Sequence, residues 1–156
     1  MCQRAVLHNL NDHPVLSNKE APSAGHKILL AEAQLRSLRR ITIGVTDTPM
    51  LAKKTLPELI LPCKQRIAEL REYLEDCDSG IEYNIVPIND PFGPSIVEED
   101  LEAIIGSEES KLGCQKVNEK RFVWRLNVNV WCGLLHSTQL WPPAGLREAS
   151  MHWKLS

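Results

Sequence analysis

Residues 25–45 read GHKILLAEAQLRSLRRITIGV, and this stretch decides the fold class. In its first part apolar residues recur every three or four positions, which is typical of an amphipathic helix, at Ile28, Ala31, Leu35 and Leu38. Residues 41–45 are a mainly β-branched run bounded by turn-forming residues, as expected of a buried strand. The stretch therefore predicts a helix followed directly by a buried strand.

The same alternation of helix and strand continues along the chain. A second helix is predicted from Pro57, because apolar residues share one face at Ile60, Cys63, Ile67, Leu70 and Leu74. Further patterns predict strands at 81–88 and 103–106, a loop at 89–94, a short acidic helix at 98–102, a helix at 110–121 and a strand of period two at 122–132. Strands that alternate with helices indicate parallel βαβ units, so the predicted fold class is α/β, with helices flanking a parallel sheet.

The two ends of the chain lack the clear residue periodicity of its middle. Within residues 1–23 only the stretch 5–7 has the pattern of a strand, and residues 133–156 carry Pro142, Pro143 and Trp153 without a clear period. We therefore divide the chain into an atypical leader (1–23), a domain (24–132) and an atypical, poorly ordered tail (133–156).

The composition excludes several classes of protein. A chain of 156 residues can bury one full core, and 43% hydrophobic residues is too high a share for general disorder. The chain has 18 Lys and Arg residues and 20 Asp and Glu residues, and the resulting net charge of −2 argues against nucleic acid as a partner. No apolar run has the length of a membrane span or a signal peptide, so we expect a cytoplasmic protein.

The cysteines and histidines predict no metal site. The chain has 5 of each, and their spacings include neither a C-x-x-C pair nor a pattern of metal ligands. We therefore expect free thiols and no metal-binding cluster.

Residues 24–26, Ala-Gly-His, open the first predicted helix and are the most informative tripeptide. A glycine lets a phosphate approach the backbone, a helix N-terminus attracts anions, and the imidazole of His26 can donate to a phosphate oxygen. The alternative is that His26 is an ordinary surface residue at a helix start.

Polar loops follow three of the predicted strands on the same edge of the sheet. Lys53 and Lys54 follow the first, Asp90 the next, and residues 107–111 the third. Ligands of α/β sheets bind at this edge, so the loops together form a plausible nucleotide crevice. Taken singly, each feature favours an ordinary role: the lysines as a solvated pair, Asp90 as a turn cap and Ser107 as a helix N-cap.

Four blocks in a fixed order carry a resemblance to a known family. They are residues 43–54 (IGVTDTPMLAKK), 56–60 (LPELI), 87–94 (PINDPFGP) and 107–110 (SEES). Together they closely resemble the eukaryotic phosphopantetheine adenylyltransferase domain, which is also part of bifunctional coenzyme A synthase and belongs to the cytidylyltransferase-like superfamily. The resemblance covers about residues 25–121.

The resemblance implies a Rossmann-like nucleotidyltransferase that transfers AMP from ATP, with Mg²⁺, to 4′-phosphopantetheine. The products would be dephospho-coenzyme A and pyrophosphate, formed by direct attack of the substrate phosphate on the α-phosphorus. The implied catalytic residues are His26, Lys53 and Lys54. Residues implied to bind nucleotide or substrate are Ser23, Gly25, Asp90, Ser107, Glu109, Ser110 and Lys111. Ser23, Gly25 and His26 would stand in the family's H-x-G-H or T-x-G-H phosphate motif.

The chain departs from the family pattern at both ends. The G-G-T-F-D run that precedes the His motif in the family is replaced by residues 9–22, NLNDHPVLSNKEAP, and Ser23 stands where the family has His or Thr. Residues 122–156 lack the usual closing elements, and no G-x-x-x-x-G-K-[ST] loop of a kinase half occurs. Two alternatives therefore stay open: a non-catalytic nucleotide-binding or interaction protein derived from this domain, and a cytidylyltransferase.

Overall fold

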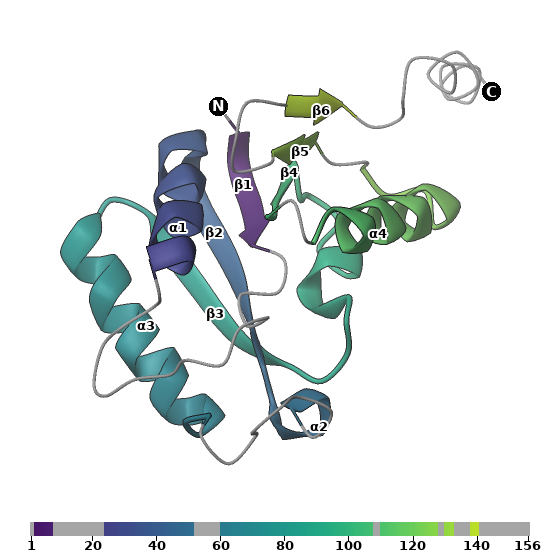
Figure 1. Ribbon diagram of the computed structural model, residues 1–156. Coiled ribbons are helices and arrows are strands. Elements are labelled where there is room, and N and C mark those ends of the chain that lie inside the picture. The colour runs from purple at the N-terminus through teal and green to yellow at the C-terminus, as the bar shows by residue number, and fades with distance from the viewer. Residues whose placement is uncertain are drawn as a thin grey trace.

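The computed structural model describes residues 2–7, 24–51, 60–107, 110–127, 130–132 and 138–140. Six strands form one sheet in the order β3-β2-β1-β4-β5-β6 (Figure 1). The strands are β1 (Cys2–Leu7), β2 (Ser37–Thr46), β3 (Glu82–Ile88), β4 (Ala103–Ile105), β5 (Val130–Cys132) and β6 (Thr138–Leu140). The helices are α1 (Ala24–Arg36), α2 (Thr48–Leu51), α3 (Cys63–Cys77), the short 3-10 helix η2 (Gly93–Ile96) and α4 (Lys111–Val123).

The sheet is parallel from β3 to β5, and only β6 is antiparallel to its neighbour. β1 lies in the middle: Ala5 is opposite Ile41 of β2 on one side and opposite Ala103 of β4 on the other. From β1 the chain adds β2 and β3 on one side, and after β3 it adds β4, β5 and β6 on the other side of β1. This is a Rossmann-like α/β fold, which confirms the predicted fold class, and β1 confirms the strand expected at residues 5–7.

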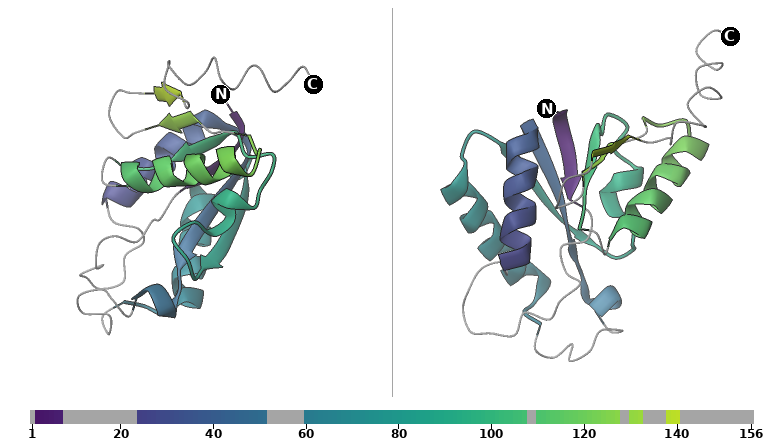
Figure 2. Two further views of the ribbon diagram at one scale, coloured as in Figure 1. Left: turned by 90° about the vertical axis from the view of Figure 1, so that its right-hand side faces the viewer. Right: turned by 45° about the horizontal axis from the view of Figure 1, so that its top comes forward.

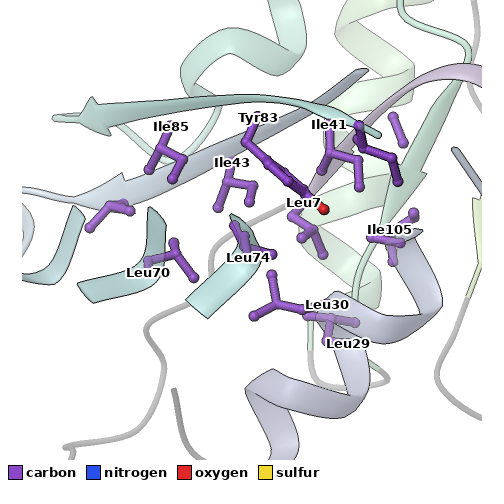
Figure 3. Packing of buried hydrophobic residues seen from close by; sticks show 14 of the residues in the cluster. Leu7, Leu29, Leu30, Ile41, Ile43, Leu70, Leu74, Tyr83, Ile85 and Ile105 are labelled. Carbon is purple, nitrogen blue, oxygen red and sulfur yellow. The ribbon is translucent and has the colours of Figure 1, made fainter. Parts of the chain in front are cut away.

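Helices cover both faces of the sheet (Figure 2). Because side chains alternate along a strand, Leu7 packs under α1 and α3, whereas Val6 packs on the other face under α4. Figure 3 shows the larger core, in which Leu7, Ile41, Ile43 and Ile105 of the strands meet Leu29, Leu30, Leu70 and Leu74 of α1 and α3. The core therefore fixes α1 over the centre of the sheet.

A buried arginine links α4 to the connection between β3 and β4. The Arg121 side chain on α4 is fully buried, and its guanidinium donates to four backbone carbonyl groups: Ser95 and Glu98 at 2.7 Å, Asn127 at 2.6 Å and Glu99 at 3.3 Å. Three of these carbonyls belong to the connection from β3 to β4. The Glu98 carboxylate in turn accepts from the Thr42 hydroxyl of β2 at 3.0 Å, so this connection is fastened to both α4 and the sheet.

The predicted buried face of the first helix is wrong. Ile28, Leu35 and Leu38 are 53%, 70% and 49% exposed, and α1 instead buries Leu29, Leu30 and Ala33. Apolar residues occur on two sides of this helix, so periodicity alone cannot choose between them. The helix also ends at Arg36, before Leu38, the last apolar position of the predicted pattern, because β2 already begins at Ser37.

The second predicted helix has the expected face but a later start. α3 buries Leu70 and Leu74, with Cys63 and Ile67 packed beside them, as predicted. It begins at Cys63, because Pro62 disfavours a helical conformation of the residue before it. Residues 60–62 are accordingly not helical, and 52–59 lie outside the described residues.

Two further predictions fail in the second half of the chain. The acidic helix at 98–102 is absent from that described segment, and the short helix there is η2, which begins at Gly93 inside the predicted loop and has Pro94 in its first turn. The long strand at 122–132 is also wrong, since α4 continues to Val123 and, among the described residues of this range, the strand is confined to Val130–Cys132. In the predicted tail, Thr138–Leu140 forms β6, and the rest of the tail lies outside the described residues.

Candidate functional site

The carboxyl ends of the five parallel strands, β1 to β5, lie at one edge of the sheet. In Figure 1 the arrows of β1 and β2 point downward, toward the end of the molecule where α1 begins. The strand order reverses between β1 and β4, and in open α/β sheets ligands bind outside the carboxyl ends at such a point. The helices that follow β1 and β4 in the sequence, α1 and α4, cover opposite faces of the sheet.

The N-terminus of α1 carries Gly25 and His26. Gly25 is exposed, and no other described group lies within 4 Å of the position that a Cβ would take there. His26 is half-buried and precedes the buried Leu29, Leu30 and Ala33 by three, four and seven residues. Side chains at these spacings share one face of a helix, so His26 continues the sheet-facing side of α1 toward the end of β1. An exposed glycine beside this imidazole leaves room for a phosphate at the helix end.

The N-terminus of α4 carries Ser107, Ser110 and Lys111. The Ser110 hydroxyl donates to the Ser107 carbonyl at 3.0 Å, and the Ser110 amide lies 3.4 Å from the Ser107 hydroxyl. The N-cap residue of α4 is Ser110 and not Ser107, so the alternative interpretation of Ser107 as the helix N-cap is wrong. Because the first amides of a helix have no acceptor within it, this end of α4 also suits an anion.

Asp90 follows β3, and its carboxylate accepts hydrogen bonds from the backbone of the turn that it begins. One carboxylate oxygen, Oδ1, accepts from the amides of Phe92 at 2.8 Å and Gly93 at 3.0 Å. Gly93 has a φ of 48°, and a Cβ there would approach Ile88 to 2.7 Å, so this turn requires glycine. The geometry matches the turn-capping alternative for Asp90.

Arg66 is a residue at this edge that the sequence interpretation missed. It is half-buried on α3, where Nε donates to the Leu61 carbonyl at 2.9 Å and Nη2 donates to the carbonyl of Thr46, the last residue of β2. One signal was available: Arg66 is a charged residue three positions after Cys63 and four before Leu70, on the apolar face of the helix.

Cys63 lies beside Arg66 without the features of a nucleophile. Its sulfur is 3.9 Å from the Val45 carbonyl oxygen. Burial raises the pKa of the Cys63 thiol, Arg66 opposes this shift, and Asp47 adds to it. The thiol is therefore protonated at neutral pH, and the site has no activated cysteine here.

Several predicted site residues lie outside the described part of the chain, namely Ser23, Lys53, Lys54 and Glu109. The structure has Gly25 and His26 in the first turn of α1, and Ser107, Ser110 and Lys111 at the start of α4, whose first residue is Lys111. Within the described ranges, no three His, Cys, Asp or Glu side chains group as metal ligands. None of the described helices has the length and apolar character needed to cross a membrane.

Fold and geometry define the class: a Rossmann-like α/β domain with two helix N-termini following the central strands. No family model matches the chain. It is 37% identical over 97 residues to the phosphopantetheine adenylyltransferase of Methanothermobacter thermautotrophicus, covering 62% of this chain and 56% of that protein. The Saccharomyces cerevisiae protein of the same name is 29% identical over 97 residues, which are 62% of this chain and 32% of that protein. The chain therefore carries a domain similar to phosphopantetheine adenylyltransferase.

Two further comparisons concern proteins without an assigned activity. An uncharacterized protein of Schizosaccharomyces pombe is 32% identical over 117 residues, which are 74% of this chain and 37% of that protein. A solved structure of an Archaeoglobus fulgidus protein of unknown function superposes with a TM-score of 0.64 at 26% identity, covering 88% of this chain and 95% of that one. The chain thus spans between about a third and little more than half of the length of these curated relatives. The A. fulgidus structure matches most of this chain and nearly all of its own.

Proposed function

We propose that this protein is a pantetheine-phosphate adenylyltransferase of the eukaryotic type, acting in coenzyme A biosynthesis in the cytoplasm. It would transfer AMP from ATP to 4′-phosphopantetheine and release pyrophosphate. The observation that carries the proposal is the start of α1: an exposed glycine and a sheet-facing histidine follow the central strand, at the strand-order reversal. Similarity to proteins named phosphopantetheine adenylyltransferase supports the same function.

The chemistry needs positioning and charge stabilisation rather than a covalent nucleophile. A phosphate oxygen of 4′-phosphopantetheine forms a bond to the α-phosphorus of ATP, and the bond to the pyrophosphate oxygen breaks. His26 and the amides at the start of α1 would stabilise the charge that develops on the phosphates. Ser107, Ser110 and Lys111 would hold the nucleotide from the start of α4, with Glu109 beside them. Lys53 and Lys54 would meet the acidic substrate, and Ser23 and Asp90 would add hydrogen bonds at the rim.

Mg²⁺ is expected to accompany ATP in this reaction. The ion would be held through the phosphates of ATP, water and one or two carboxylates, as is usual for Mg²⁺ with nucleotides. The chain's own task is then to orient the phosphates that carry the ion.

A second candidate is a nucleotide-binding protein without catalysis. What favours it is the sequence between β1 and α1: residues 8–23 lack the glycine turn that brings the backbone close to the triphosphate in the resembling family. Such a chain would bind ATP but turn over slowly or not at all.

Pyrophosphate release separates the candidates. With ATP and 4′-phosphopantetheine, the proposed enzyme releases pyrophosphate only when both substrates are present. ATP binding by calorimetry without turnover would contradict the adenylyltransferase and support the binding protein. Tighter binding of CTP than of ATP would point instead to a cytidylyltransferase.

The variant Gly25→Ala tests the location of the site. A methyl group at position 25 meets no described neighbour, and alanine is the better helix former by about 1 kcal/mol, so the fold should not suffer. If a phosphate approaches the backbone here, ATP affinity falls although the melting temperature does not. Unchanged ATP affinity would place the phosphates elsewhere.

A further inference from the structure

α1 exposes an apolar stripe on the side that points away from the sheet. The stripe consists of Ala24, Ile28, Ala31 and Leu35, all of which are exposed, Ile28 at 53% and Leu35 at 70%. Because these residues follow one another at spacings of four, three and four, they share one side of the helix. That side is opposite the one that α1 buries against the sheet. We call these four residues the outer stripe.

The neighbouring helix has the polar outer face that is usual for a helix covering a sheet. α3 lies beside α1 on the same face of the sheet (Figure 1), and its exposed positions include Lys64, Arg71 and Glu75. The outer stripe of α1 has no polar side chain, and its residues are among those whose period predicted a buried face. Contact of the outer stripe with another apolar surface is therefore favourable.

The charged residues that flank the outer stripe interact within the same molecule. On one flank, Lys27 Nζ lies over the Tyr73 ring of α3, 5.6 Å from its centroid. On the other flank, Arg36 Nε donates to the Glu32 carboxylate at 2.9 Å. A surface with charges of one sign repels its own copy, whereas this neutral stripe does not. The charge distribution thus favours a second copy of the chain over an acidic or basic partner.

The order of side-chain sizes along the outer stripe also fits a second copy. From Ala24 to Leu35 the order is small, large, small, large. If two copies of α1 pack antiparallel about a twofold axis between positions 28 and 31, Ile28 faces Ala31 of the partner subunit. In the same packing Leu35 faces Ala24 of the partner subunit. Each large side chain then meets a small one, so the two helices can interdigitate through one repeated surface.

We propose that the outer stripe of α1 is a docking surface for a second copy of this chain, with the two α1 helices antiparallel across a twofold axis. This inference goes beyond the proposed function and does not depend on it, because His26 lies on the opposite, sheet-facing side of α1. A helix of 13 residues is about 20 Å long and about 10 Å wide. The interface is therefore smaller than the roughly 1,200 Å² of stable complexes, and the dimer should be weak and depend on concentration.

Sedimentation velocity of the full chain tests this proposal at protein concentrations from about 1 µM to about 1 mM. The wild-type protein should pass from monomer to dimer within this range. Leu35→Lys should weaken the association at least about a hundredfold, because loss of one buried leucine corresponds to about tenfold and the dimer contains this residue twice. Leu112→Lys is the matched control, since Leu112 lies on α4, is also 70% exposed and should not affect association.

An exchange of large and small residues tests the antiparallel packing. Ile28→Ala leaves two small side chains facing each other, and Ala31→Leu brings two large ones together, so each change alone should weaken the dimer about tenfold. The double variant with both changes restores one large and one small residue at each contact. Its dissociation constant should return to within about threefold of the wild-type value. A double variant that associates no better than the weaker single variant would contradict this packing.

Wild-type protein that stays monomeric over the whole concentration range would overturn the proposal. A dimer that Leu35→Lys leaves unchanged would also overturn it, because that dimer would use another surface. If the wild type is monomeric and the melting temperature falls in Leu35→Lys but not in Leu112→Lys, another segment of this chain covers the outer stripe. If Leu35→Lys does not fold, the exchange of Ile28 and Ala31 decides by itself. Pyrophosphate release is measured independently, so this proposal and the proposed function can fail separately.

Discussion

His26 lies half-buried on the sheet-facing side of α1, directly after the exposed Gly25. If its imidazole stabilises charge on the phosphates in the transition state, His26→Ala should lower kcat by about 10² to 10³ with a smaller effect on ATP affinity. Steady-state kinetics combined with an ATP titration measures both. Leu35→Ala, an exposed position on the opposite side of the helix, is the control and should change neither. Equal kcat in His26→Ala and wild type would remove His26 from the mechanism.

The residues that sequence reasoning missed are arginines inside the fold. Residues 110–121 read as a polar helix, yet Arg121 is buried and binds carbonyls from segments that are more than 20 residues away. Sequence alone cannot identify such partners, because they are backbone groups that any residue type supplies. Gly25 and His26 could be singled out because a glycine and an imidazole at a helix start suit the binding of a phosphate.

The end of α4 is closed by a residue in a strained conformation. Arg125 has a φ of 57°, while the Leu126 amide donates to the Arg121 carbonyl at 2.9 Å and the Arg125 amide to the Phe122 carbonyl at 3.1 Å. This hydrogen-bond pattern is a Schellman motif, in which glycine is preferred at the left-handed position. We therefore predict that Arg125→Gly raises the free energy of unfolding by about 1 kcal/mol, as urea denaturation would measure.

A second glycine substitution in the same helix provides the comparison. Lys116 is exposed in the interior of α4, so Lys116→Gly should lower the free energy of unfolding by about 1 kcal/mol. The account of the helix end is wrong if Arg125→Gly destabilises the protein as Lys116→Gly does.

Element types were easier to predict than element ends and faces. The strands at 81–88 and 103–106 were predicted nearly to the residue, because β-branched and apolar runs there lie between clear turn residues. The alternation of Phe122, Trp124 and Leu126 mimicked a strand, but these residues lie at the end of α4 and just beyond it. The position of the helix end depends on the burial of Arg121 and on the backbone hydrogen bonds that close the helix. The local periodicity of the sequence shows neither.

At the scale of the whole molecule, β1 determines whether the sheet is one unit. It pairs with β2 on one side and β4 on the other, although its sequence lies in the predicted leader. We predict that a chain beginning at residue 24 does not unfold cooperatively, because its sheet would be split and the core would lose Leu7 and Val6. Thermal denaturation followed by circular dichroism checks this. A truncated chain that melts as sharply as the full chain would show that residues 1–23 are dispensable for the fold, as the predicted domain boundary at residue 24 implies.

The central claim is that the carboxyl edge between β1 and β4 holds the phosphates of ATP. Titration of ATP into isotope-labelled protein, followed by amide chemical shifts, tests it without requiring turnover. The account predicts that the largest shifts occur at Gly25, His26, Gly106 and Lys111, while Gly80, which lies before β3 at the opposite edge, does not move. Shifts confined to the opposite edge, or no shifts at millimolar ATP, would contradict it.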